Sequence, residues 1–131
     1  LNFMARLRKT RLSVAILSGY GSQREELRRA LDACQVDLES LTVECNTVDA
    51  FQGREADIAI YSVTRCNDKG EIGFLREHRR LNVALSRARS GLVVVGCVAF
   101  LRSVRGFNPW NKVIDYIESH PNDCVIQEVQ E

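Results

Sequence analysis

Short apolar runs that alternate with helical patterns constrain the fold of this chain more than any other feature. The runs are rich in Leu, Ile and Val, and they lack the regular polar alternation of a strand with one solvated face. Such runs are typical of strands that are buried on both faces of a parallel sheet. The predicted strands span residues 12–18, 42–48, 57–64, 92–95 and 124–126.

Between these runs, apolar residues recur at the spacing of an amphipathic helix. Ser22 and Glu25 have the form of a capping box, which predicts a helix that starts there. Its predicted buried stripe is Leu27, Ala30, Leu31 and Cys34. A second helix is predicted up to Ser90, with its stripe at Leu81, Ala84, Leu85 and Ala88. Shorter helices are predicted at 99–104 and 109–120. The alternation predicts an α/β fold, a three-layer, mostly parallel sheet with helices on both faces.

The length and composition predict one domain. A chain of 131 residues with 45% hydrophobic residues can close one core of ordinary size and not two. Its formal net charge of +1 excludes an overall basic coat protein for nucleic acid and an acidic disordered chain. No apolar run approaches the roughly 20 residues that span a bilayer, and no segment resembles a secretory signal. We therefore expect no membrane partner and an intracellular location, cytoplasmic or nuclear.

The cysteines and the chain ends give further expectations. The five cysteines are odd in number and form no C-x-x-C pair, so we expect buried free thiols of a reducing compartment. His78 and His120 lack ligand-like partners, so we expect no metal site. Residues 1–10 look like the end of a helix whose start is missing, which predicts a fragment of a longer protein. Residues 121–131 are expected to form a short C-terminal strand or tail.

Loops at the carboxyl ends of parallel strands are where ligands of open α/β sheets bind. The loop after the first predicted strand, 19–24, places Arg24 in the first turn of a helix. Unpaired backbone N–H groups favour an anion at that position, whereas a cation there opposes the helix dipole. Arg24 is therefore a candidate ligand for an anion. The alternative is that it pairs with Glu25 or Glu26 on a solvated face.

The second loop, 48–55, concentrates polar atoms beside a glycine. Gly53 permits a sharp or positive-φ turn, while Gln52 and Glu55 offer an amide and a carboxylate next to it. This pattern suits a binding site. An ordinary β-turn explains it equally well.

The third feature is the segment 76–89, which holds five arginines against one glutamate. On a helix, Arg80 and Arg87 fall on one flank of the apolar stripe, about 20° apart, whereas Arg89 falls on the other flank beside Asn82. Guanidinium groups can bond two phosphate oxygens at once, which predicts an anion site on this segment. A solvated basic face is the alternative.

Three motifs in this order resemble motifs IV, V and VI of superfamily-one helicases of the up-frameshift and senataxin type. They are LSGYGSQR at 17–24, TVDAFQGREAD at 47–57 with GFL at 73–75, and RRLNVALSRAR at 79–89. The resemblance covers roughly residues 10–120. It departs at Gly19 and Gly21, where relatives often have Pro and an acidic residue, and at Ser86, where Thr is common. The sequence holds no G-x-x-x-x-G-K-[ST] phosphate loop, which in this family belongs to the first RecA-like domain.

The resemblance implies the second, C-terminal RecA-like domain of an ATP-dependent helicase, related to P-loop NTPases. It makes Arg87 the arginine finger and Arg24 a second sensor of the γ-phosphate. It assigns the nucleotide to Gln52, Gly53, Glu55 and Tyr20, and the single-stranded nucleic-acid backbone to Thr47, Asp49, Thr64 and Asn82. It leaves Arg80 and Arg89 as structural or nucleic-acid-facing.

ATP with Mg²⁺ is the implied cofactor, and the magnesium ligands are expected in the first RecA-like domain of the same chain. Single-stranded RNA or DNA is the implied partner. We expect ATP-dependent helicase activity of the intact parent protein and almost no ATP hydrolysis by these 131 residues alone. The alternative is a non-catalytic nucleic-acid-binding or scaffolding module derived from a helicase. A third possibility is an unrelated α/β domain that binds a small anion.

Overall fold

The computed structural model describes residues 11–34, 38–63 and 78–129. Four strands form one sheet, in the order β2-β1-β3-β4, and all neighbouring pairs are parallel. The elements are β1 (Leu12–Ser18), α2 (Gly21–Ala33), β2 (Leu41–Thr47), β3 (Ala56–Ser62), α3 (His78–Leu85), β4 (Ala88–Val95), α4 (Val98–Ser103) and α5 (Pro109–Ser119). The predicted α/β fold with a parallel sheet is confirmed.

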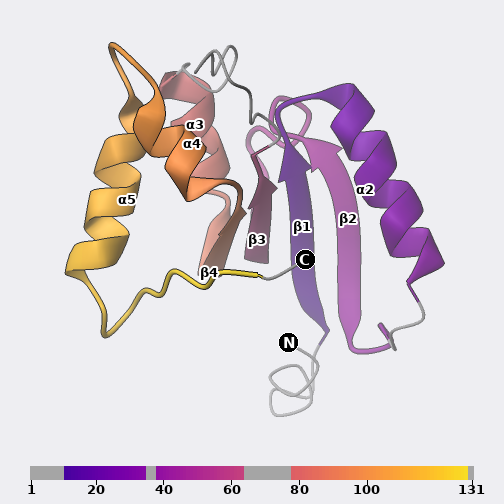
Figure 1. The fold of residues 1–131 in the computed structure, drawn as a ribbon. Helices are drawn as coiled ribbons and strands as arrows, with labels where there is room; N and C mark the ends of the chain where they lie inside the picture. The colour runs from indigo at the N-terminus through magenta and orange to yellow at the C-terminus, as the bar shows by residue number, and fades with distance from the viewer. Residues whose placement is uncertain (1–10, 35–37, 64–77, 130–131) are drawn as a thin grey trace.

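Helices cover both faces of the centre of the sheet. α2 packs against β1 and β2, whereas α3 packs against β3 and α4 packs against α5 (Figure 1). Successive residues of a strand point to opposite faces. On β1, Leu12 and Val14 are buried on one face, and Ala15 and Leu17 are buried on the other. This two-sided burial explains why β1 is an almost continuous apolar run in the sequence.

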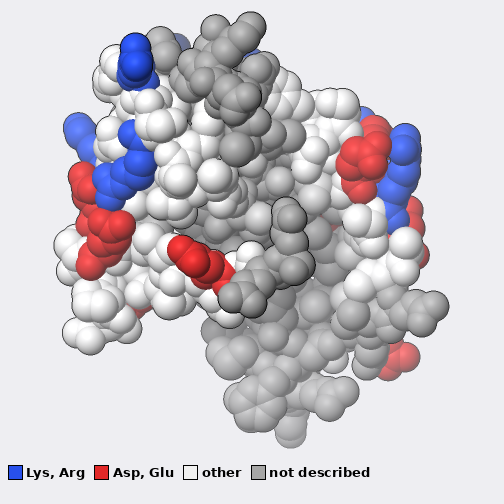
Figure 2. All heavy atoms as spheres, viewed as in Figure 1, with Lys and Arg blue, Asp and Glu red and all other residues white. Residues whose placement is uncertain are grey.

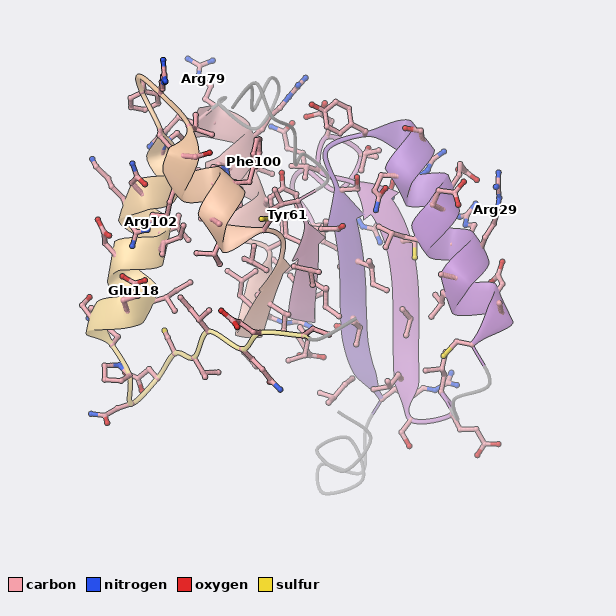
Figure 3. The ribbon with its side chains drawn as sticks, in the orientation of Figure 1. Arg29, Tyr61, Arg79, Phe100, Arg102 and Glu118 are labelled. Atoms are coloured by element: carbon pink, nitrogen blue, oxygen red, sulfur yellow. The ribbon has the colours of Figure 1, made fainter. Side chains whose placement is uncertain are left out.

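The largest part of the core lies between the sheet and the helices α3, α4 and α5. Tyr61 of β3 stacks on Trp110 of α5 with ring centroids 6.0 Å apart. Phe100 of α4 belongs to the same buried cluster (Figure 3). Burial raises the pKa of Tyr61 to about 12, because the interior disfavours a phenolate. This cluster includes Leu81 and Ala84 and so packs α3 against β3.

The first predicted helix begins differently from the expectation. Tyr20 is the N-cap of α2 and no side chain caps the helix, so the capping box at Ser22 is wrong. No residue of α2 is fully buried, and Ala30 and Cys34 of the predicted stripe are exposed. The helix lies near the β2 edge of the sheet (Figure 1), where its apolar side chains are only partly covered.

The second predicted helix ends earlier than expected. α3 ends at Leu85, and Ala88 is already paired with Ala56 in the β3–β4 ladder. The carbonyl of Val83 accepts from Arg87 Nε at 2.9 Å and from the Ser86 hydroxyl at 3.2 Å. These side chains occupy the acceptor that another helical turn would need. The helical-wheel placement of Arg87 and Arg89 is therefore wrong, because neither lies on the helix.

The remaining expectations concern the C-terminal segment and the cysteines. Residues 121–129 form a turn and an irregular segment, so no strand forms at 124–126. The described cysteines are all free, as predicted, but only Cys45 is buried and Cys34 and Cys97 are exposed. The predicted helix end at 1–10 lies outside the described residues. No helix in the part of the chain that the structure describes is long and apolar enough to cross a membrane.

Candidate nucleotide and nucleic-acid sites

The segment 48–55 passes over the sheet from the carboxyl ends of the strands, here called the carboxyl edge, to their amino ends, the amino edge. It leaves the carboxyl end of β2 and enters the amino end of β3, and β1 lies between these two strands. Val48 and Phe51 are buried in the same cluster as Leu81 and Ala84 of α3. The crossing therefore lies on the α3 face of the sheet, with Asp49 near the carboxyl edge and Glu55 near the amino edge.

The candidate residues divide between the two ends of the strands, and only some of them lie at the carboxyl ends where ligands of open α/β sheets bind. Arg24 and Asp49 do follow the carboxyl ends of β1 and β2. Glu55 and Arg87 instead precede the first residues of β3 and β4. A connection between parallel strands must return to the amino edge before the next strand begins. One motif can therefore place residues at both edges.

Arg87 lies between α3 and β4 with its guanidinium folded over nearby backbone. Its Nε donates to the Val83 carbonyl at 2.9 Å, one terminal nitrogen donates to the Arg54 carbonyl at 3.1 Å, and the other to the Ser86 hydroxyl at 2.8 Å. These acceptors are all neutral. Among the described residues, no carboxylate forms an ion pair with Arg87. The guanidinium charge is therefore not neutralised within the described part of the domain.

Arg54 and Glu44 form an ion pair between the crossing segment and β2. One guanidinium nitrogen of Arg54 donates to Glu44 Oε1 at 2.8 Å, and the other bonds Oε2. The guanidinium also lies over the ring of Phe51, with Cζ 4.6 Å from the ring centroid. The Arg54 side chain lowers the pKa of Glu44 below its usual value of 4.5. This pair was not predicted, because its members lie on different elements and no local sequence pattern links them.

Arg24 has a very different environment from Arg87. Its Nε and one terminal nitrogen donate to Glu25 Oε1 at 3.0 and 2.6 Å. The Arg24 and Glu25 side chains are 36% and 43% exposed. This is the surface pairing that the sequence left open as the alternative. The structure does not bring Arg24 into contact with Arg87, and the two lie at opposite ends of their strands.

Two of the nucleic-acid candidates, Thr47 and Asp49, lie at the carboxyl end of β2, and Asn82 lies in α3. The Thr47 hydroxyl accepts from the Ala50 N–H at 3.3 Å, and Asp49 forms an ion pair of 3.1 Å with Arg80 in α3. Asn82 is exposed on the same helix, and its amide lies 3.1 Å from His78 Nδ1. Asp49 and Arg80 therefore join the crossing segment to α3.

Arg89 lies at the amino edge of the sheet, where its contacts join neighbouring strands. It forms an ion pair of 3.2 Å with Asp57 of β3. The same carboxylate accepts from the backbone N–H and the hydroxyl of Ser13 in β1, at 2.9 and 3.0 Å. The Ser13 N–H is the main cause that lowers the Asp57 pKa below its usual value of 3.8. Arg89 thus ties β4 to β3 and β1.

The other candidates are less constrained. Gly53 has φ of +80°, and a Cβ built there would meet nothing within 4 Å. Gln52 and Glu55 beside it are exposed, so a ligand can reach them. Tyr20 caps α2 and donates its N–H to the Ser18 hydroxyl at 3.1 Å. Thr64 lies outside the described residues.

Further charged side chains on the described surface form ion pairs within or between helices. In Figure 2, charged side chains gather over α2 and over α4 and α5. Arg102 of α4 bonds Asp115 and Glu118 of α5 at 2.6 and 2.8 Å (Figure 3). Arg29 of α2 pairs with Glu26 at 3.0 Å and points away from the sheet. Within the described residues, no group of three or more His, Cys, Asp or Glu side chains could hold a metal ion.

A protein family described as an AAA domain matches residues 2–99 of the chain. The chain belongs to this family. Its motifs and its relatives identify it as a superfamily-one helicase domain of the up-frameshift and senataxin type, which confirms the resemblance seen in the sequence.

Its similar proteins are much longer helicases. The chain is 44% identical over 90 residues to the DNA polymerase alpha-associated DNA helicase A of Saccharomyces cerevisiae, covering 69% of this chain and 13% of that protein. It is 40% identical over 102 residues to helicase sen1 of Schizosaccharomyces pombe, covering 78% of this chain and 6% of that protein. The ATP-dependent helicase NAM7 of Saccharomyces cerevisiae is 44% identical over 87 residues, covering 66% of this chain and 8% of that protein. The chain thus spans a small part of these relatives.

Proposed function

We propose that this chain is the C-terminal RecA-like domain of an ATP-dependent nucleic-acid helicase. In this proposal ATP binds between the domain and a preceding RecA-like domain of the same protein, and Arg87 is the arginine finger. One observation carries the proposal most directly. Arg87 has only neutral hydrogen-bond acceptors within the described structure, so its charge is available for an anion.

The nucleotide side of the proposal uses the amino edge of the sheet. Arg87 would turn a terminal nitrogen from the Ser86 hydroxyl to γ-phosphate oxygens, which accept stronger, charge-assisted hydrogen bonds, and would keep its bond to the Arg54 carbonyl. There it would stabilise the charge that develops during phosphoryl transfer. Glu55 and Gly53 would lie against the ribose and Gln52 near the phosphates. The exposure of Gln52 and Glu55 and the open space at Gly53 fit this use.

Two further residues would reach the nucleotide from the carboxyl edge. Arg24 would act as a second γ-phosphate sensor, which requires it to leave Glu25. Tyr20 would pack near the base. The Mg²⁺ ligands would come from the preceding RecA-like domain, so this chain would contribute charge and position without holding the metal.

The nucleic-acid side uses Thr47, Asp49 and Asn82, with Thr64 as a further candidate. Hydroxyl and amide groups bond backbone oxygens without reading the sequence of bases, which suits a protein that moves along a strand. The relatives' names include a DNA helicase and a putative ATP-dependent RNA helicase, so single-stranded DNA and RNA are both candidate partners. ATP and nucleic acid are substrates of the cell interior, where we place the protein.

The test is nucleic-acid-stimulated ATP hydrolysis by the full-length parent, with single-stranded RNA and DNA compared at one salt concentration. We expect stimulated Mg-ATP turnover by the parent and almost none by the 131 residues alone. Substantial ATP hydrolysis by the isolated chain would refute the proposal that it needs a preceding RecA-like domain for activity. A parent that binds single strands without hydrolysing ATP would instead favour the non-catalytic binding module.

A further inference from the structure

We propose that Glu44 and Arg54 are positioning residues for Arg87, holding the segment 54–56 against which the finger is set. The inference rests on the proposed function, because it needs Arg87 to act on a phosphate. Neither residue touches the nucleotide in this proposal. Their effect reaches the reaction only through Arg87.

The segment 54–56 contacts both the guanidinium and the main-chain carbonyl of Arg87. The Arg54 carbonyl accepts from the Arg87 guanidinium at 3.1 Å. Two residues later, the Ala56 N–H donates to the Arg87 carbonyl at 3.0 Å. One short stretch of backbone therefore sets both the main chain and the side chain of Arg87.

The Arg54 side chain anchors that stretch to a rigid element. Glu44 is in the middle of β2, in register with Ala15 of the central strand. Two guanidinium–carboxylate bonds fix the orientation of Arg54 as well as its distance from β2. The Phe51 ring beneath the guanidinium belongs to the buried core cluster. Movement of the Arg54 backbone would therefore have to break contacts with both the sheet and the core.

Because both side chains of the Glu44–Arg54 pair are partly exposed, we expect the pair to affect the position of Arg87 more than the stability of the fold. The Arg54 and Glu44 side chains are 50% and 39% exposed. Ion pairs exposed to this extent contribute little to the free energy of unfolding. By contrast, a displacement of about 1 Å at a reacting group can cost about 100-fold in rate. Loss of the pair should thus change kcat much more than it changes thermal stability.

The pair also keeps a second cation away from the nucleotide. Glu44 neutralises Arg54, whereas Arg87 meets neutral acceptors only within the described residues. Arg54 and Arg87 lie side by side at the amino edge, but the charge of Arg54 is neutralised by a carboxylate and that of Arg87 is not, within the described residues. Arg87 is therefore available to bind a phosphate, whereas Arg54 is already bound to a carboxylate.

The experiment measures single-strand-stimulated ATP hydrolysis by the full-length parent. Glu44→Gln preserves the shape of the side chain and removes its charge. We expect it to lower kcat by about 10-fold to 100-fold, with KM for ATP changed less than about 2-fold. Arg54→Lys keeps the charge but loses the two-point contact, so we expect a decrease in the same direction. It also serves if Glu44→Gln does not fold.

A double-mutant cycle separates positioning from general structural damage. In an Arg87→Ala background, Glu44→Gln should cause little further loss of kcat, because no finger remains to be positioned. Equal losses of kcat in both backgrounds would overturn the inference. Glu26→Gln, which breaks the exposed Arg29–Glu26 pair on α2, is the matched control and should leave kcat unchanged.

The outcomes also distinguish this inference from the proposed function. If Arg87→Ala lowers kcat strongly and Glu44→Gln does not lower it, the positioning role is wrong and the finger stands. If Arg87→Ala leaves kcat unchanged, the finger assignment fails and the positioning role fails with it.

Discussion

The first turn of α2 and the junction between α3 and β4 each present an arginine for which we propose the same ligand, the γ-phosphate of ATP. Arg24 in the first region bonds the carboxylate of its neighbour Glu25. Arg87 in the second bonds two carbonyls and a hydroxyl. The residue type and the proposed ligand are the same. The two differ in the groups that bind the guanidinium, which are a carboxylate for Arg24 and neutral oxygens for Arg87.

This difference bears on how readily each arginine can bind a phosphate. Arg24 must give up an ion pair, whereas Arg87 has to give up only its bond to the neutral Ser86 hydroxyl, which is weaker than an ion pair. The junction is also the more constrained region, since Arg87 is bonded to backbone on both sides of its Cα. We infer that the junction is already set for catalysis, and that the first turn of α2 must rearrange when the nucleotide binds.

The largest expected effect is at Arg87. In the full-length parent, Arg87→Ala should lower kcat by about 10³-fold or more, the scale of arginine fingers. KM for ATP should change less, because the finger acts mainly on charge that develops in the transition state. Steady-state ATP hydrolysis with saturating single strands measures both. An undiminished kcat would move the finger elsewhere.

Arg24→Ala should have a smaller effect, with a loss of about 10²-fold in kcat/KM, as for removal of one charge-stabilising donor. Glu25→Gln is the informative partner variant, because it frees Arg24 from its carboxylate. We expect Glu25→Gln to lower KM for ATP. A raised KM would show that the Arg24–Glu25 pair is needed in the bound state, which would contradict the inferred rearrangement.

Acid should weaken the junction region through Asp57. Its folded pKa is lowered by the Ser13 N–H first and by the Ser13 hydroxyl and Arg89 as well, so the unfolded chain takes up a proton at higher pH. The stabilisation is complete above the usual carboxyl pKa of 3.8 and is lost as pH falls through the lowered value. Asp57→Asn should cost about 2 kcal/mol near neutral pH.

Urea unfolding of the wild-type and Asp57→Asn chains, near neutral pH and near pH 3, checks this account. The difference between the two proteins should shrink in acid. A difference that is independent of pH would show that the carboxylate charge does not contribute.

The smallest expected effect compares Gly21, in the first turn of α2, with Gly53, in the crossing segment that contacts the junction. Gly53 has φ of +80° with open space around its Cα, so Gly53→Ala should destabilise the fold by about 1 kcal/mol from backbone strain alone. Gly21 starts α2, also with open space, and has no positive φ. Gly21→Ala should be neutral or slightly stabilising. Thermal unfolding of both variants tests this, and equal melting temperatures would contradict the strain at Gly53.

The sequence predicted the elements that carry their own apolar signal. β1 and α5 match their predicted bounds closely, because a buried run and a proline-led apolar face are local properties. The first half of β4 was missed, since Ala88-Arg89-Ser90-Gly91 has no strand-like pattern of its own. Its extended conformation depends on the ladder to β3, which no local window contains.

The sequence proposes which residues make up the candidate site, whereas their arrangement could not be predicted from it. The motifs identified Arg87, Arg24 and the loop around Gly53 from residue types alone. The separation of these residues between the two edges depends on the strand order, in which β1 lies between β2 and β3. The Glu44–Arg54 pair depends on the same crossing, because it joins a strand to a segment that passes over its neighbour.

The most direct test of the central claim compares nucleotide states on the full-length parent and its Arg87→Ala variant. ADP represents the ground state, and ADP with aluminium fluoride represents the transferring phosphoryl group. A finger should contribute mainly to the second complex. We predict that Arg87→Ala weakens Kd for ADP–aluminium fluoride by about 10²-fold or more and leaves Kd for ADP nearly unchanged. Equal Kd values of the variant and the wild type for ADP–aluminium fluoride would contradict the account.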